Sequence, residues 1–372
     1  MTISLMLPAV SSPSAAGGRR PASGSLPVLA VGLLLQFPLA LAAQEEQRGI
    51  PEPTARDKQV DRAVVGALKY LASNQQPSGA WLLQQNGEST AATSLAIMSF
   101  MAAGHVPGEG PYGSRIDRGI RWVIDHQQRN GMIVHNQSHG PMYSHGISTL
   151  MLAEVAGMVQ GQLGRDVRLA LERGIEVILK AQNVSKSKKH AGGWRYHSTS
   201  ADSDLSVTGW QLLALRAARN IGCDVPAENI DQAVEYVNNC VGETPGFGYQ
   251  PGSSSTPTLS GVGILALEVC GEHHSPAVLR AAGELVRRPL KYDNRFYFYG
   301  AYYCTVGMFK VGGDQWNAVR PQLIDELLEH QESDHSWIAR YGNEKGAGRI
   351  YCTAMAVLAL TVEYRYLPIY QR

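Results

Sequence analysis

The chain has 372 residues, 44% of them hydrophobic and only 17% charged, and these proportions allow a large buried core. The formal net charge is +1, because Lys+Arg and Asp+Glu are almost equal in number. A balanced charge excludes the electrostatic footprint of a polyphosphate partner, so we expect no nucleic-acid binding.

The first 43 residues have the order of a secretory signal peptide. Arg19 and Arg20 precede an apolar run over residues 26–41, and small residues end the run at Ala42 and Ala43. This order of charged, apolar and small residues is typical of export signals. The run is about 16 residues long and contains two prolines, which disfavours a permanent membrane span. We therefore expect an exported protein, periplasmic or extracellular, that is cleaved after Ala42 or Ala43.

A polar, proline-bearing linker is expected over residues 44–56, and a repeat occupies residues 57–372. Each copy pairs an amphipathic stretch with a glycine-aromatic loop and a second stretch rich in Ala, Leu, Ser and Thr. The clearest copy runs from residues 67–76 through Ser78-Gly79-Ala80-Trp81 to residues 90–104. Six copies occur, spaced about 42 to 58 residues apart, and such a period indicates stacked helical pairs. The other five copies begin at residues 119, 174, 233, 281 and 323.

The two stretches of each copy differ in character. The first type carries charge on one face, as at Arg118, Arg121 and Asp125, which is typical of a surface helix. Charge nearly vanishes in the second type, as over residues 90–104 and 256–267, which indicates a helix buried on every side. Such helices are buried completely only when the pairs close into a ring. We therefore predict an all-α fold, a single (α/α)6 toroid of six helical hairpins, with an open solenoid as the alternative.

Three loops share a motif of glutamine, glycine and tryptophan: Gln75-Gln76-Pro77-Ser78-Gly79-Ala80-Trp81, Gly192-Gly193-Trp194 and Gln331-Glu332-Ser333-Asp334-His335-Ser336-Trp337. They resemble the repeats of the superfamily that contains squalene cyclases, other class II terpene cyclases and protein prenyltransferase β subunits. Within this superfamily the chain looks most like bacterial secreted proteins with prenyltransferase/squalene-oxidase repeats. The resemblance covers residues 57–368 and implies the toroid. Because the repeat is structural, it does not carry a function with it.

The prenyltransferase branch would imply a zinc ion held by an Asp, a Cys and a His where inner helices begin. The tract Tyr299-Gly300-Ala301-Tyr302-Tyr303-Cys304 is similar to the His-bearing tract of that branch, but Gly300 stands where the resemblance requires the His. The preceding copy, residues 246–259, offers neither the Asp nor the Cys. We therefore expect no metal ion and no other cofactor.

The terpene-cyclase branch would imply an acid. Its members protonate an alkene or epoxide with the middle carboxyl of an Asp-x-Asp-Asp motif that precedes an inner helix. Here Asp202-Ser203-Asp204-Leu205 precedes residues 206–220, so the resemblance places the acid at Asp204 and its partner at Asp202, with Leu205 replacing the last Asp. Such an acid must be kept protonated by burial and hydrogen bonding. The alternative is that Asp204 is an ordinary N-cap residue.

An isoprenoid ligand or a carbocation also requires an aromatic lining, since a ring face attracts a cation by about 0.5 to 2 kcal/mol. The third and fifth copies supply five candidates: Trp194, Trp210, Tyr299, Tyr302 and Tyr303. We predict that these rings line a cavity in the toroid. Core packing is the alternative, and we expect Trp81, Trp194 and Trp337 to pack between helix pairs.

Three histidines, His135, His139 and His145, lie in the loop that leads into the second inner helix. Their spacing of four and then six residues matches no standard pattern of metal ligands. We predict a hydrogen-bonding cluster at the mouth of the cavity, in which His139 and His145 contact the ligand. A metal site is the alternative.

These features predict an exported toroid that binds a hydrophobic, isoprenoid-like ligand or a protein partner in its central cavity. Two alternatives remain open. One is a class II terpene-cyclase-like enzyme with Asp204 as its acid. The other is a polysaccharide lyase in which Arg195, beside Trp194, would serve as the base. The length argues against full cyclase activity, because triterpene cyclases of the resembling family add a second helical domain. No stable membrane span is expected after signal cleavage.

Overall fold

Helices make up almost all of the regular structure in the computed structural model, which describes residues 54–136 and 140–371. The signal peptide predicted over residues 1–43 lies outside the described residues and stays a prediction. The helices are α1 Ala55–Ser73, α2 Thr90–Ala102, α3 Gly113–Asp125, α4 Pro141–Val155, α5 Gly161–Gln182, α6 Leu205–Asn220, α7 Ala227–Asn239, α8 Pro257–Val269, α9 Pro276–Arg287, α10 Tyr297–Val311, α11 Gly313–Glu329 and α12 Arg349–Leu360. A hairpin of β1 Leu82–Leu83 and β2 Gly87–Glu88 and the short 3-10 helices η1 Asn343–Gly346, η2 Val362–Tyr364 and η3 Pro368–Tyr370 complete the described elements.

The helices alternate between two environments. The odd-numbered helices are amphipathic: α3, for example, buries Ile120 and Val123 and exposes Arg118 and Arg121. The even-numbered helices are buried on nearly every side, and all 13 residues of α2 are buried. Within the described ranges, none of the helices is both long and apolar enough to cross a membrane.

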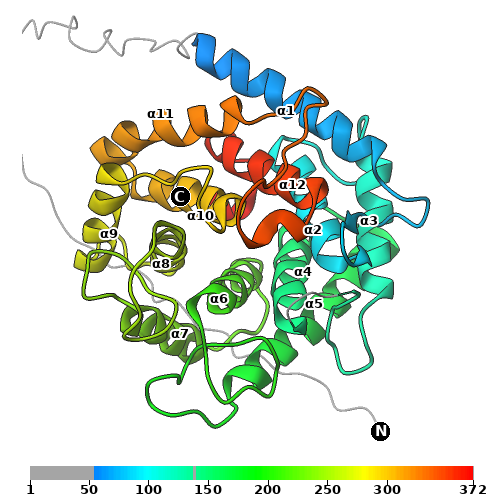
Figure 1. The fold of residues 1–372 in the computed structure, drawn as a ribbon. Coiled ribbons are helices and arrows are strands. Elements are labelled where there is room, and N and C mark those ends of the chain that lie inside the picture. Colours follow the sequence, from blue (N-terminus) through cyan, green and yellow to red (C-terminus); the bar gives the residue numbers. More distant parts are fainter. Residues whose placement is uncertain (1–53, 137–139, 372) are drawn as a thin grey trace, which may run out of the picture. The chain divides into compact units, whose positions relative to one another are not determined.

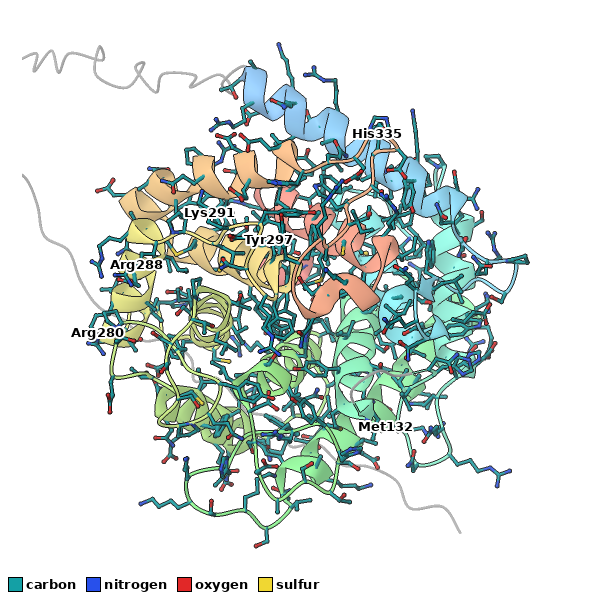
Figure 2. All side chains as sticks on the ribbon, viewed as in Figure 1. Met132, Arg280, Arg288, Lys291, Tyr297 and His335 are labelled. Carbon is teal, nitrogen blue, oxygen red and sulfur yellow. The ribbon has the colours of Figure 1, made fainter. Side chains whose placement is uncertain are left out.

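The even-numbered helices form a closed inner ring. They pack against one another in the order α2, α4, α6, α8, α10 and α12, and α12 packs against α2. The odd-numbered helices lie outside this ring (Figure 1), and side chains fill the space between the ribbons (Figure 2). The predicted all-α toroid is therefore confirmed. The open solenoid is wrong, because the first and last inner helices are in contact.

A glutamine fastens four of the loops that join an outer helix to an inner one. The side-chain amide of Gln75 donates to Gly79 O in its own loop (2.9 Å) and to Arg115 O in α3 (2.8 Å). Equivalent pairs of hydrogen bonds join three further loops to α5, α7 and α1, and they are made by Gln127, Gln182 and Gln331. Each glutamine thereby attaches its own loop to the next outer helix, and it gives a donor to a loop carbonyl that is shielded from water.

The last of these bridges closes the ring. Gln331 Nε2 donates to Ala63 O of α1 at 3.0 Å. His335 packs so closely on α1 that a Cβ atom on Gly66 would lie 2.5 Å from its Cγ, and Figure 2 places His335 beside α1. Two ion pairs join α1 and α11 at this seam: Arg320–Asp57 at 3.0 Å and Arg56–Asp325 at 2.7 Å.

The tryptophans of the shared motif pack between helix pairs, as predicted. Trp81, Trp194 and Trp337 are at most 1% exposed. The indole N–H of Trp194 donates to Ile178 O of α5 at 2.8 Å, and its backbone N–H donates to the hydroxyl of Thr208 in α6 at 3.0 Å. Trp81 and Trp337 make the equivalent bonds in their own copies. Each tryptophan therefore ties its loop to both helices of a pair.

The loop that joins α9 to α10 is held by two carboxylates in place of a glutamine. Tyr292 N–H donates to Glu326 Oε1 of α11 at 2.7 Å. Glu344 comes from the sixth loop, and its two oxygens accept the backbone N–H groups of Phe298 and Tyr299 at 2.9 Å each. These N–H groups lie in the first turn of α10, where they have no partner within the helix. Glu344 therefore caps α10 and holds the two loops together.

Replacing Trp194 separates its packing from its hydrogen bond. Trp194→Ala removes a fully buried ring, so we expect the free energy of unfolding to fall by about 3 to 5 kcal/mol. Trp194→Phe keeps most of the ring but loses the indole hydrogen bond to Ile178 O, which should cost about 0.5 to 1.5 kcal/mol. Chemical denaturation measures both. A loss below about 1 kcal/mol for the Ala variant would contradict the structural role and would place Trp194 in a binding wall.

Candidate functional site

The inner helices all begin at the same end of the ring, and polar and aromatic side chains gather there. We call this end the mouth. Its members come from α4, α6, α10 and α12 and from the third and fourth loops: Tyr143, Arg195, Tyr196, Asp202, Asp204, Ser206, Tyr249, Tyr299 and Tyr351.

Asp204 is the N-cap of α6 and is fully buried. Its Oδ1 accepts the backbone N–H of Val207 at 2.9 Å, whereas Oδ2 has no hydrogen-bond partner among the described residues. Burial raises the pKa of Asp204 to about 7, although the Val207 N–H and the charge of Arg195 oppose the rise. One carboxyl oxygen thus caps the helix, while the other faces the guanidinium of Arg195.

Arg195 joins the two aspartates of the motif. Its Nη1 lies 3.0 Å from Asp202 Oδ2, and its Nε lies 3.8 Å from Asp204 Oδ2. The guanidinium also lies over the rings of Tyr196 and Tyr249, 4.8 and 5.6 Å from their centroids, as in cation–π contacts. Asp202 is half-exposed, so solvent reaches it but does not reach Asp204. A fixed positive charge therefore stands beside the buried acid and would stabilise its ionised form.

Half-buried tyrosines surround this group. Tyr143, Tyr299 and Tyr351 are the third residues of α4, α10 and α12, so the helical repeat brings all three to the mouth. Tyr299 OH donates to Ser206 O at 2.9 Å and accepts from Ser206 Oγ at 3.0 Å. Tyr351 OH donates to Glu344 Oε1 at 2.9 Å, and the hydroxyls of Tyr196 and Tyr249 bond to each other. The mouth therefore presents aromatic surface whose hydroxyls already have partners.

Most of the predicted aromatic lining lies deeper and is closely packed. Trp210 stacks on Tyr302 at 5.5 Å between centroids and meets the edge of Tyr303 at 5.3 Å. All three rings are at most 2% exposed, whereas Tyr299 reaches the mouth. A ligand could contact Trp210 only after these rings moved. A role in ligand binding for Trp194, Trp210, Tyr302 and Tyr303 therefore stays a prediction.

His145 occupies the position at which three other copies have a threonine that accepts a backbone N–H of the loop, namely Thr93, Thr208 and Thr353. Its Nδ1 accepts the backbone N–H of Ile133 at 3.0 Å, and its Nε2 donates to Gly174 O of α5 at 3.0 Å. Burial lowers the pKa of His145 to about 4, so the ring is neutral. Both ring nitrogens are thus engaged in holding the second loop. His139 lies outside the described residues, and His135 packs against Trp122 and His126.

Within the part of the chain that the structure describes, no three His, Cys, Asp or Glu side chains are placed to hold a metal ion. The position at which the resemblance would require a histidine has no room for one. A Cβ atom on Gly300 would lie 2.7 Å from Thr258 Oγ1 and 2.9 Å from Leu290 Cδ2. The close packing of α10 therefore accounts for the glycine.

Sequence reasoning missed several members of the mouth. Tyr143 and Tyr351 have a signal that was available, because they share the helical register of Tyr299. Tyr249 has a signal as well, since it follows Phe247 by two residues as Tyr196 follows Trp194. Glu344, which contacts the mouth through Tyr351 OH, has none, because it comes from the sixth loop and meets α10 only in the folded ring.

Comparison with known proteins supports the fold. No family model matches the sequence, and no curated protein matches it. Among solved structures, the type II terpene cyclase MstE from Scytonema is similar over 83% of this chain and 100% of its own, with a TM-score of 0.54 and 15% identity. An α-1,6-mannanase from Salegentibacter is similar over 82% of this chain and 99% of its own, with a TM-score of 0.61 and 10% identity. The chain therefore shares the α/α toroid fold with these enzymes.

The protonation of Asp204 should appear in the stability of the protein. Its pKa of about 7 in the folded state exceeds the ordinary value of 3.8, so the folded protein keeps a proton that the unfolded chain releases between these pH values. This contribution to stability is complete at low pH and is lost as the pH rises to 7, at no more than about 1.4 kcal/mol per pH unit. Asp204→Asn still caps α6 but does not titrate.

The free energy of unfolding of the wild type, minus that of Asp204→Asn, should therefore fall between pH 4 and 7 and then become constant. Denaturation at a series of pH values measures this difference. Thr256→Ala, which removes the N-cap of α8 without removing a carboxyl, is the control and should leave the pH dependence of the wild type unchanged. Parallel curves for the wild type and Asp204→Asn would contradict a raised pKa.

Proposed function

We propose that the protein binds a neutral, hydrophobic ligand of the isoprenoid class at the mouth. One observation carries the proposal: the buried Asp204 carboxyl, whose Oδ2 makes no hydrogen bond and lies 3.8 Å from Arg195 Nε, stands beside half-buried tyrosine rings at the mouth. With a pKa of about 7, the Asp204 carboxyl is about half protonated at neutral pH, and its protonated form donates a hydrogen bond without carrying a charge. The aromatic surface around it suits an apolar body.

The charges at the mouth favour a neutral ligand. Arg195 is the cation beside Asp204, and Asp202 already pairs with it at 3.0 Å. An anionic ligand would have to displace Asp202 before it gained a counter-ion. A neutral ligand leaves this ion pair intact and needs only the aromatic surface and one hydrogen bond.

The terpene cyclase MstE supports the ligand class by analogy. One of its variants is bound to geranylgeranyl dihydroxybenzoate, a molecule with an isoprenoid chain, and its TM-score to this chain is 0.53. At 13% identity this likeness concerns the fold. The ligand class for the present chain therefore depends on its own residues at the mouth.

A second function is favoured by the same carboxyl. In a class II terpene-cyclase-like reaction, the proton on Asp204 would pass to a carbon of the substrate double bond, whose electron pair forms the new C–H bond. The remaining carboxylate would be stabilised by Arg195, 3.8 Å away, and the carbocation by the tyrosine rings. Asp202 would hold Arg195 in place, which gives the predicted partner of the acid a positioning role.

The binding proposal is tested with geranylgeraniol by isothermal titration calorimetry. Tyr143→Ala removes a ring from the mouth, and we expect binding to weaken about tenfold, the equivalent of about 1.4 kcal/mol. Tyr366→Ala, at an exposed tyrosine that follows η2, is the matched control and should bind like the wild type. Failure of the wild type to bind, or binding of an α-1,6-mannotetraose in its place, would contradict the isoprenoid class.

The catalytic alternative is tested with squalene and with a shorter polyprene. Asp204→Asn keeps the shape and most hydrogen bonding but removes the acidic proton, so turnover should vanish while stability at neutral pH changes by less than about 1 kcal/mol. Products are followed by mass spectrometry. If the wild type converts no polyprene, or if the Asn variant is equally active, Asp204 is a helix cap and a binding group but no catalytic acid.

A further inference from the structure

A hollow of about 410 Å³ lies beside the β1–β2 hairpin, and its walls share no residue with the mouth. The walls are Asn86 of the hairpin turn and Gln128, Val134, His135 and Asn136 of the second loop, which joins α3 to α4. The volume lies within the range of about 300 to 1,000 Å³ that is usual for sites of small ligands. We call this hollow the hairpin pocket.

The hairpin is tied to two neighbouring loops. Asn136 Nδ2 of the second loop donates to Glu88 O at 3.1 Å, and Gln84 N–H donates to Ala347 O of the sixth loop at 3.2 Å. The hydroxyl of Ser78 donates to Glu88 Oε1 at 2.5 Å. These bonds fix the walls of the hairpin pocket, so a ligand can enter it without a rearrangement of the chain.

The imidazole of His135 is also held in place. Its ring meets Trp122 at 5.5 Å and His126 at 4.5 Å between centroids, and its backbone N–H donates to Thr90 Oγ1 at 3.3 Å. His126 in turn stacks on Trp122 at 3.9 Å and donates from Nδ1 to Trp122 O at 2.7 Å. Burial, and then the neighbouring His126, lower the pKa of His135. At neutral pH the His135 ring is therefore uncharged, with one nitrogen that donates and one that accepts.

The side chains of the hairpin pocket indicate which kind of ligand fits. Three of the described lining residues carry carboxamides, and each carboxamide has an acceptor oxygen and an NH₂ group with two donor hydrogens. None of the described lining residues is an acid, a lysine or an arginine, so a charged ligand would find no counter-ion there. The charge of Glu88 acts on His135 and would repel an anion. Sugar hydroxyls both donate and accept hydrogen bonds without carrying a charge, so they match this lining.

We propose that the hairpin pocket binds a neutral oligosaccharide. The carboxamides of Gln128 and Asn136 and the imidazole of His135 would exchange hydrogen bonds with its hydroxyl groups, and Val134 would contact the C–H face of a sugar ring. The site is a second one, and the proposal does not depend on the ligand proposed for the mouth.

A glycan array tests the wild type against neutral oligosaccharides of mannose, glucose, galactose and xylose and against charged oligosaccharides of glucuronic and galacturonic acid. We expect binding to a neutral member and not to the charged ones. The neutral oligosaccharide that binds most tightly is then titrated by calorimetry. Gln128→Ala removes an exposed side chain of the pocket and should weaken binding about fivefold, as the loss of one hydrogen bond does. Gln59→Ala, at an exposed glutamine of α1 outside the pocket, is the matched control and should bind like the wild type.

Two further measurements locate the sugar. Its binding should move the imidazole NMR signals of His135, and an excess of geranylgeraniol should not displace it. The proposal is overturned if no neutral oligosaccharide binds, if the charged ones bind equally well, or if Gln128→Ala binds like the wild type. Displacement by geranylgeraniol with unmoved His135 signals would assign the sugar to the mouth and would also overturn it. The proposal for the mouth is decided separately, by the binding of geranylgeraniol itself.

Discussion

Glutamine side chains in this ring donate hydrogen bonds to backbone carbonyls of the loops and of the neighbouring outer helices. Each Gln75-type amide satisfies two carbonyls at once, one in its own loop and one in the next outer helix. A helical pair is thereby coupled to its neighbour through a single side chain. Because the same bridge also joins the last pair to the first, one local interaction repeated around the chain produces a closed ring rather than an open stack.

The mouth follows from this construction. Loops that are fastened at both ends bring the N-termini of the inner helices together, and the unpaired N–H groups there attract acidic side chains as caps. Asp204 and Glu344 both cap inner helices in this way, and burial raises the pKa of each to about 7. A structural requirement of helix ends thus leaves protonatable carboxyls beside aromatic rings, which is an arrangement that proton transfer or ligand binding can use.

The fold could be predicted from the sequence because each copy of the repeat pairs a helix charged on one face with a helix that has almost no charge, and several copies have a tryptophan at the same position. The site could be predicted only in part. Asp204 can be identified because its motif is contiguous, whereas Glu344 comes from a loop whose contact with α10 depends on the whole ring. The sequence predicts His145 as a ligand residue, and in the structure its Nδ1 accepts a loop N–H as the threonine hydroxyl does in other copies, while its Nε2 donates to Gly174 O. The repeat places His145 and these threonines at the same position of their inner helices.

The seam between α1 and α11 has a consequence for how the chain is made. Gln331 and Ala63 are 268 residues apart, so a ribosome must add nearly the whole protein before this bond can form. Until then α2 lacks the neighbour that covers one of its sides, although every residue of that helix is apolar or small enough to be buried. Contacts of such long sequence separation form slowly, and exposed apolar helices aggregate. The first inner helix of the toroid therefore stays partly uncovered until nearly the whole chain is present, and its burial depends on the closure of the ring.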